Sequence, residues 1–184
     1  MSIAENVAEI RRQMEAAALA AGRDPKEILL CAATKMNDAD AVRQAIAAGV
    51  DCCGENRVQE LTAKLAQNAY DGAPVHFIGH LQTNKVRQVV GKVSLIQSVD
   101  SARLLAAIDR EAARQGIVQD ILLEVNIGEE ASKSGFAAGG HSSSDGKNRR
   151  IFKHMYQRSH GNPPNQPHFG RKSKIFSKNV PLIC

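Results

Sequence analysis

Apolar and polar residues follow two alternating patterns along residues 1–138. Short, nearly continuous apolar runs predict buried strands, and the stretches between them carry apolar residues every three or four positions, as amphipathic helices do. The predicted strands are residues 27–35, 50–56, 74–81, 93–99 and 119–128, and the predicted helices are residues 2–23, 37–49, 57–69, 83–91 and 100–116. Strands and helices that alternate with short links predict βαβ units and a parallel sheet.

Residues with capping character mark the ends of these helices. Ser2 and Glu5 have the spacing of a capping box, and Gly22 stands where the first helix should end. The other predicted N-caps are Asn37 or Asp38, Asn56 and Asp100.

Polar residues also gather directly after the predicted strands. In a (β/α)8 barrel these positions form the active face, to which each strand contributes one or two residues. We therefore predict an α/β fold of the (β/α)8 TIM-barrel type that begins with an extra helix and is incomplete, with about five strands. No GxGxxG or P-loop pattern stands at a strand–helix junction, which argues against a dinucleotide or nucleoside triphosphate site. The polar residues are Lys35, Glu55, Asn56, Arg57, His80, Gln82, Asn84, Ser98, Asp100, Asn126 and Glu129.

Lys35 stands where the first apolar run ends, and it has two interpretations. The commoner one is a loop lysine whose amine extends into water. The other is an amine in a partly desolvated pocket, where its pKa falls and it condenses with a carbonyl to form a Schiff base. Hydrophobic periodicity does not distinguish the two. The segment 54–60 is equally open, since it fits either a helix N-terminus or a ligand contact.

We predict no metal site. His76 and His80 are four residues apart, but on a strand such a pair does not share one face as it would on a helix. The cysteines show no metal-ligand spacing, and reduced thiols in the cytoplasm are the simplest interpretation. The cysteines are Cys31, Cys52, Cys53 and Cys184.

Composition divides the chain into two parts. Residues 139–184 hold nine Lys and Arg against one acidic residue, no alanine and four of the six prolines, whereas residues 1–138 are acidic on balance and rich in alanine. We expect a partial barrel over residues 1–138 and an irregular, disordered basic tail over residues 139–184. The net charge of +5 therefore comes from the tail. One interpretation of the tail is a nucleic-acid-binding arm with interleaved aromatic residues, which we consider the weaker one.

Several segments together resemble one family. They are ATKMND (33–38), GENRVQE (54–60), HFIGHLQTNKVR (76–87), SVDS (98–101) and VNIGEEASKSGF (125–136). In this order and at these intervals they resemble the pyridoxal 5′-phosphate (PLP) homeostasis proteins, which have an alanine-racemase-type N-terminal barrel. The resemblance covers residues 3–138.

The resemblance implies a site and a role. Lys35 would form a Schiff base with PLP, Asn56 would lie beside the cofactor, and Ile78 and Ser98 would line the ring pocket. The implied function is PLP binding and intracellular PLP homeostasis without turnover, so we predict no catalytic residue. The alternative is a PLP-dependent enzyme of the racemase type, which would need a positioned acid or base. We expect a cytoplasmic monomer without a membrane partner, and PLP-dependent apoenzymes as recipients of the cofactor.

The resemblance stops after residue 138. The late segments that hold the cofactor phosphate in this family do not occur in residues 139–184, so we expect PLP binding to be impaired. One hypothesis is that these residues are the same gene read out of frame, since shifting a back-translation of YQRSHGNPPN (156–165) by one nucleotide restores a family-like strand. The coding DNA between Phe136 and Arg150 tests this hypothesis.

Overall fold

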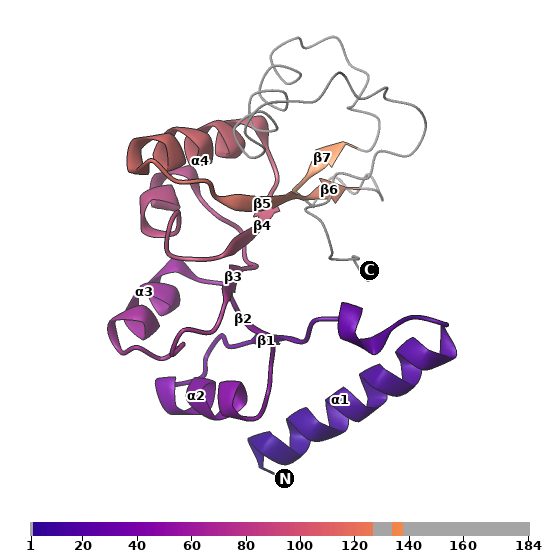
Figure 1. Ribbon diagram of the computed structural model, residues 1–184. Helices are drawn as coiled ribbons and strands as arrows, with labels where there is room; N and C mark the ends of the chain where they lie inside the picture. Colours follow the sequence, from indigo (N-terminus) through magenta and orange to yellow (C-terminus); the bar gives the residue numbers. More distant parts are fainter. Residues whose placement is uncertain (1, 127–133, 138–184) are drawn as a thin grey trace. The chain divides into compact units, whose positions relative to one another are not determined.

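Strands and helices alternate along the chain in this computed structural model, which describes residues 2–126 and 134–137 (Figure 1). The chain divides into two units, one up to Gly79 and one from His80. The strands pair in parallel, β1–β2–β3 in the first unit and β4–β5 in the second. The predicted α/β class with about five parallel strands is confirmed. The predicted boundary at residue 138 stays a prediction, and the tail beyond it lies outside the described residues.

The described residues of the first unit form three strands and three α-helices. Strand β2 lies between β1 and β3, with Cys31 opposite Cys52 and Gly54 opposite His76. Its elements are α1 (Ile3–Ala20), the 3₁₀ turn η1 (Pro25–Glu27), β1 (Cys31–Ala33), α2 (Ala39–Ala47), β2 (Cys52–Glu55), α3 (Val58–Ala66) and β3 (Val75–Phe77).

Two of the predicted caps in this unit are present. The hydroxyl of Ser2 accepts from the backbone N–H of Glu5, and the Glu5 carboxylate accepts from the Ser2 backbone N–H at 2.7 Å, which completes the capping box. Asp38 caps α2 by accepting from the backbone N–H of Ala41 at 2.8 Å. The prediction of Asn56 as the cap of α3 is wrong, because Arg57 occupies that position without a side-chain cap bond.

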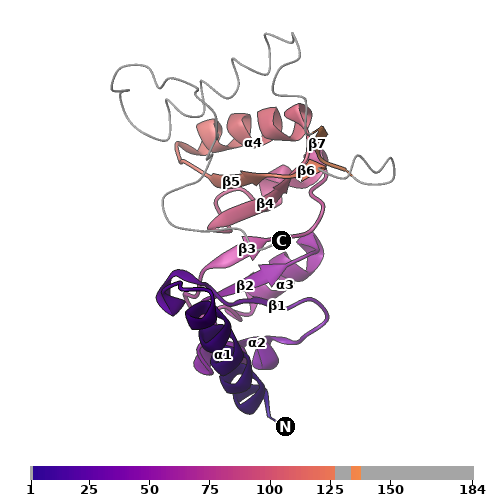
Figure 2. The same cartoon turned by 90° about the vertical axis from the view of Figure 1, so that its right-hand side faces the viewer.

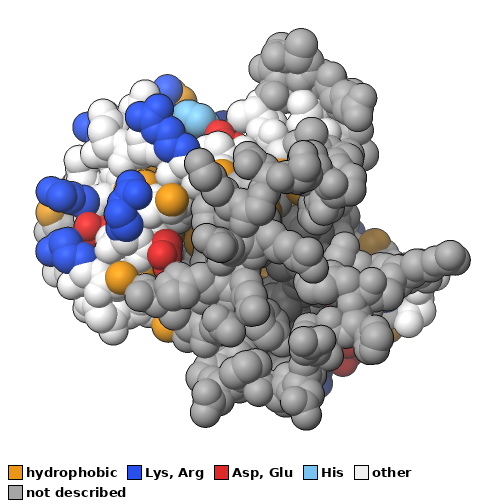
Figure 3. Space-filling view, turned by 90° about the horizontal axis from the view of Figure 1, so that it is seen from above, with side chains coloured by type: hydrophobic (Ala, Val, Ile, Leu, Met, Phe, Trp, Pro, Cys, Tyr) orange, Lys and Arg blue, Asp and Glu red, His pale blue; other side chains and the backbone are white. Residues whose placement is uncertain are grey.

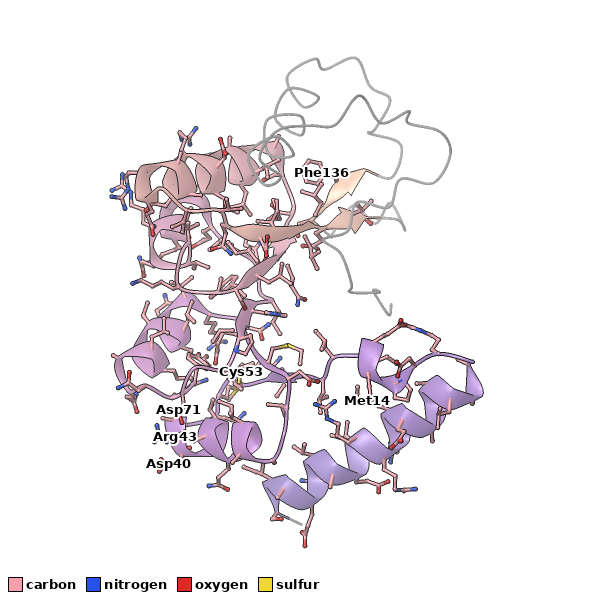
Figure 4. All side chains as sticks on the ribbon, viewed as in Figure 1. Met14, Asp40, Arg43, Cys53, Asp71 and Phe136 are labelled. Atoms are coloured by element: carbon pink, nitrogen blue, oxygen red, sulfur yellow. The ribbon has the colours of Figure 1, made fainter. Side chains whose placement is uncertain are left out.

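The strands of the first unit have two unlike faces. Helices α2 and α3 lie on the same side of these strands (Figure 1). The face toward the helices, called the helix face, carries Cys53, Glu55 and Phe77, none of them measurably exposed. Cys53 is labelled in Figure 4, within the sheet. The opposite face, called the open face, carries Cys31, Ala33, Cys52, Gly54, His76 and Ile78.

Helix α1 packs through few side chains. Val7 is buried, whereas Ile10 is 44% exposed. Met14, labelled in Figure 4, lines a hollow between α1 and η1 together with Lys26 and Leu29. Among the described residues, no helix is both long enough and apolar enough to cross a membrane.

In the second unit, strands β4 and β5 pair with each other, and helix α4 packs beside them. Helix α4 lies along β4 and β5 in both views (Figures 1 and 2). Ser101 caps α4 by accepting from the backbone N–H of Leu104, so the prediction of Asp100 as the cap is wrong. The elements are η2 (Thr83–Gln88), β4 (Leu95–Val99), α4 (Ala102–Gln115), β5 (Asp120–Leu123), β6 (Val125–Asn126) and β7 (Phe136–Ala137).

Two predicted elements of this unit differ from the structure. The predicted helix 83–91 is a shorter 3₁₀-helix, Thr83–Gln88. The predicted strand 119–128 breaks at Glu124, whose backbone N–H donates to Val99 while its carbonyl accepts from Phe136. Because Glu124 bonds on both sides, the chain passes there from the pairing of β5 with β4 to the pairing of β6 with β7.

Candidate functional site

Lys35 lies in a turn directly after β1, with its side chain exposed. The backbone on each side of it is held in place. The Met36 N–H donates to the Glu60 carboxylate at 2.8 Å, and the Asn37 N–H donates to the Thr34 carbonyl at 3.2 Å. Met36 has a φ of 61°, in the left-handed region that non-glycine residues rarely adopt. The structure therefore presents the Lys35 amine to solvent from a constrained turn.

A buried polar network on the helix face supports this turn. The Lys64 ammonium donates at 2.6 Å to the Glu55 carboxylate and at 2.6 Å to the backbone carbonyl of Thr34, the residue before Lys35. The same carboxylate oxygen accepts from the Thr34 hydroxyl and from the Tyr70 hydroxyl. Burial, followed by the charge of Glu55, raises the pKa of Tyr70, so the phenol stays a neutral donor at neutral pH.

The sequence alone does not reveal this network. Glu55 belongs to the polar residues predicted at strand ends, whereas the structure buries it completely beneath α3. Lys64 carries no sequence signal of burial, yet only 7% of its side chain is exposed. Buried charges persist in proteins when they are paired and hydrogen-bonded. Glu55 meets this condition through Oε1, whereas its buried Oε2 has no hydrogen-bond partner among the described residues. No sequence periodicity marks such a pair.

Asn56 follows β2 and presents an unpaired acceptor. Its Oδ1 atom is buried and has no hydrogen-bond partner among the described residues. Its backbone lies against Gly79, where a Cβ in place of the glycine hydrogen would come within 2.1 Å of the Asn56 carbonyl oxygen. Only glycine fits at that distance, so the end of β3 is tightly held against Asn56. A buried amide oxygen without a donor is costly in a folded protein and points to a donor supplied from outside.

Ile78 follows β3 and is half-buried on the open face. Its backbone N–H donates to the Glu55 carbonyl at 2.9 Å, and its Cδ1 lies 2.8 Å from where a Cβ on Gly54 would be. Its side chain thus covers Gly54 and offers an apolar surface at the same end of the strands as Lys35 and Asn56.

Three of the four predicted site residues belong to one unit. Lys35, Asn56 and Ile78 each follow the carboxyl end of a strand, and those three strands are neighbours in the parallel order β1–β2–β3. Ser98 is buried on β4 in the second unit, and its predicted role stays a prediction.

The two histidines that lie four residues apart have separate partners. His80 pairs through Nδ1 with the Asp100 carboxylate at 3.1 Å in the second unit. His76 lies on β3 with its Nδ1 at 3.6 Å from the Cys52 sulfur. The sequence spacing of the two histidines therefore does not describe the grouping that forms.

Cys31, Cys52 and His76 form a cluster of potential ligands on the open face, with their ligand atoms within 4.8 Å of one another. A hydrogen bond from Cys52 lowers the pKa of the Cys31 thiol to about 5, and the nearby His76 adds to this. The same bond, together with burial, raises the pKa of Cys52. Sequence spacing does not reveal this cluster, because its members are 21 and 24 residues apart and meet only through strand register.

Exposed charges of both signs lie side by side on the surface. Figure 3 shows Lys and Arg side chains interspersed with Asp and Glu on the described part of one face. Charge pairing also reaches beneath the surface: on α4 the exposed Arg114 guanidinium donates to the buried Glu111 carboxylate and lowers its pKa to about 2. The nucleic-acid-binding arm considered for residues 139–184 lies outside the described residues.

The chain is similar to proteins of known identity. Residues 2–143 match the family described as alanine racemase, N-terminal domain. The pyridoxal phosphate homeostasis protein of Pseudomonas aeruginosa is 39% identical over 136 residues, which are 74% of this chain and 59% of that protein. The chain thus spans about three fifths of the length of the curated relatives it matches.

Solved structures give the same picture. PipY of Synechococcus elongatus, in a structure with PLP bound, is 32% identical, with a TM-score of 0.65 over 85% of this chain and 65% of that chain. An alanine racemase of Streptomyces coelicolor is 17% identical, with a TM-score of 0.59 over 84% of this chain and 39% of that chain. The second likeness bears on the fold alone. Together they confirm the predicted barrel-type fold in incomplete form.

Proposed function

The chain belongs to the family of the alanine racemase N-terminal domain, and we propose that it binds PLP through a Schiff base to Lys35 and serves PLP homeostasis. The likeness to proteins named for that role, and to PipY with PLP bound, supports the proposal. In the linkage, the Lys35 nitrogen bonds to the aldehyde carbon of the cofactor and one water is released, so the reaction reverses without a further reagent.

The arrangement around Lys35 is the observation that carries this proposal. An exposed amine extends from a turn that is held by Glu60 and, through the Thr34 carbonyl, by Lys64. A fixed backbone limits the positions that the amine can reach, which lowers the entropic cost of meeting one aldehyde.

The residues next to Lys35 fit the other parts of the cofactor. PLP supplies an aldehyde, a polar aromatic ring and a phosphate. The unpaired Oδ1 of Asn56 is an acceptor for a hydroxyl or a protonated ring nitrogen, and Ile78 is an apolar surface for the ring face. Because the Asn56 oxygen is already buried, a donor from the cofactor would satisfy it without further desolvation.

These residues fit a role in storing and delivering PLP better than a role in catalysis. Racemisation needs an acid or base beside the reacting carbon, in addition to the lysine. Two carboxylates that support the Lys35 turn are engaged: Glu55 binds Lys64, and Glu60 binds the Met36 N–H. We therefore propose a carrier without catalytic turnover, which hands PLP to apoenzymes in the cytoplasm.

The test uses the full chain incubated with PLP, reduced with borohydride and mapped by peptide mass spectrometry. We expect one adduct, on Lys35. Lys35→Arg keeps the charge and should abolish the adduct, whereas Lys26→Arg, which alters an exposed lysine of the same unit, should leave it unchanged. Labelling spread over several lysines, or retained in Lys35→Arg, would contradict the proposal.

Three further measurements accompany this test. Asn56→Leu is expected to weaken PLP binding about tenfold, in line with the loss of one hydrogen bond of about 1.4 kcal/mol. A PLP titration of the wild type also tests the impairment expected from residues 139–184. An assay for alanine racemisation in the presence of PLP should show no activity, and measurable turnover would favour the enzyme alternative.

A further inference from the structure

Three side chains that the proposed function does not use meet on the open face of the first unit. Cys31 comes from β1, Cys52 from β2 and His76 from β3, and their ligand atoms lie within 4.8 Å of one another. Gly54 helps to bring them together: it is opposite His76, and a Cβ there would lie 3.1 Å from the Cys31 sulfur. The missing side chain lets the Cys31 sulfur and the Ile78 side chain approach the β2 backbone closely.

The spacing of these atoms matches the edges of a tetrahedral metal site. With Zn–S bonds of about 2.3 Å and Zn–N bonds of about 2.05 Å, a sulfur and a nitrogen on one zinc ion are about 3.6 Å apart. The Cys52 sulfur and His76 Nδ1 are 3.6 Å apart in this structure. The Cys31 sulfur lies within 4.8 Å of both atoms, so its distance to His76 must close by about 1.2 Å or less for it to occupy a third vertex.

We propose that Cys31, Cys52 and His76 bind one Zn²⁺ ion on the open face, with a fourth position open to water or another small ligand. Two thiolates and an imidazole are ligands that zinc prefers, whereas Mg²⁺ and Ca²⁺ take oxygen ligands. The three ligands differ in exposure: Cys52 is 2% exposed, while Cys31 and His76 are half-buried. One side of the ion therefore remains within reach of solvent, as in zinc sites with three protein ligands.

Neighbouring Cys53 provides the internal control. It follows Cys52 directly but lies on the helix face, fully buried, with its pKa raised to about 11 mainly by burial. Because successive residues of a strand point to opposite faces, its thiol is directed away from the cluster. A site that depends on strand register should therefore be lost on changing Cys52 and kept on changing Cys53.

The test titrates the tag-free, reduced full chain with Co²⁺ and then with Zn²⁺ in competition with a chromophoric chelator. We expect one Co²⁺ per chain, with thiolate-to-cobalt charge transfer in the near ultraviolet and the visible bands of tetrahedral Co²⁺, both lost when Zn²⁺ displaces the cobalt. Cys31→Ser and His76→Gln should each weaken Zn²⁺ binding at least about 100-fold, since loss of an outer-shell partner alone costs 10–100-fold.

The controls separate this site from other thiols and histidines. Cys53→Ala and Cys184→Ser should keep both the spectrum and the affinity, and circular dichroism checks that each variant is folded. Cys31 and His76 are half-buried, so their variants are expected to fold. Absence of a tetrahedral thiolate spectrum in the reduced wild type, or its persistence in both Cys31→Ser and His76→Gln, would overturn the proposal. Neither result would affect the formation of the PLP adduct on Lys35, which tests the proposed function separately.

Discussion

The two faces of β2 carry polar groups that are used in opposite ways. On the helix face, Glu55 is fully buried and bonds to Lys64, Tyr70 and Thr34. On the open face, Cys52 belongs to a cluster of three potential metal ligands, of which Cys31 and His76 are half-buried. Alternate residues of a single strand thus serve stability on one side and ligand chemistry on the other.

The difference shows how burial assigns roles. Glu55 is hydrogen-bonded to internal partners, because a charge buried without them would be too costly. Cys31 and His76 are only half-buried, so the cost of covering their polar atoms is smaller than it is for Glu55. A polar residue at a strand end is therefore evidence of a ligand site only after its burial and its partners are known.

The largest expected effect comes from removing the Lys64 ammonium, which pairs with Glu55 on the helix face. Lys64→Met should lower the free energy of unfolding by about 3–5 kcal/mol, because it leaves the Glu55 carboxylate buried without its partner. Urea denaturation followed by circular dichroism measures this. Adding Glu55→Gln to Lys64→Met should recover part of the loss. A cost similar to that of the exposed control Lys26→Met would show that the network contributes little.

The second test sets one cysteine from each face against the other. Cys53→Ser places a hydroxyl in the fully buried helix face and should cost about 1–3 kcal/mol of unfolding free energy. Cys31→Ser, on the open face, should cost less than about 0.5 kcal/mol when metal is removed with EDTA. Both are measured by urea denaturation at neutral pH. Equal costs for the two variants would contradict the assignment of the faces.

The smallest effect concerns pH and the Tyr70 phenol. Tyr70→Phe removes the hydrogen bond to Glu55 and should cost about 1–2 kcal/mol at pH 7. The folded pKa of Tyr70 lies above its ordinary value of 10.0, because of burial and then Glu55, so the unfolded chain loses this proton first as the pH rises. Its contribution is complete below pH 10 and is lost as the pH rises further.

This prediction has a direct readout. Unfolding free energies of the wild type and of Tyr70→Phe, measured between pH 8 and 11, should converge as the pH rises. A gap that widens with pH would mean that the phenol ionises more readily in the folded protein than in the unfolded chain.

Much of the fold follows from local patterns in the sequence. The alternation of apolar runs with amphipathic stretches predicts the order of strands and helices, because burial on one side imposes a period on each element. The capping box at Ser2 and the Asp38 cap are likewise predictable, since a cap acts over three residues. Asn56 and Asp100 are wrong as caps because the next residue, Arg57 or Ser101, takes that position.

The candidate site likewise has features that the sequence predicts and features that only the structure shows. The ends of apolar runs in the sequence placed Lys35 and Asn56 at the ends of successive strands, whereas Ile78, inside the predicted strand 74–81, came only from the family resemblance. Only the tertiary structure decided that Lys64 lies buried against Glu55 and that Cys31, Cys52 and His76 share one face. Those contacts join residues from different elements, and their partners are chosen by strand register and helix packing, which no local pattern of residues encodes.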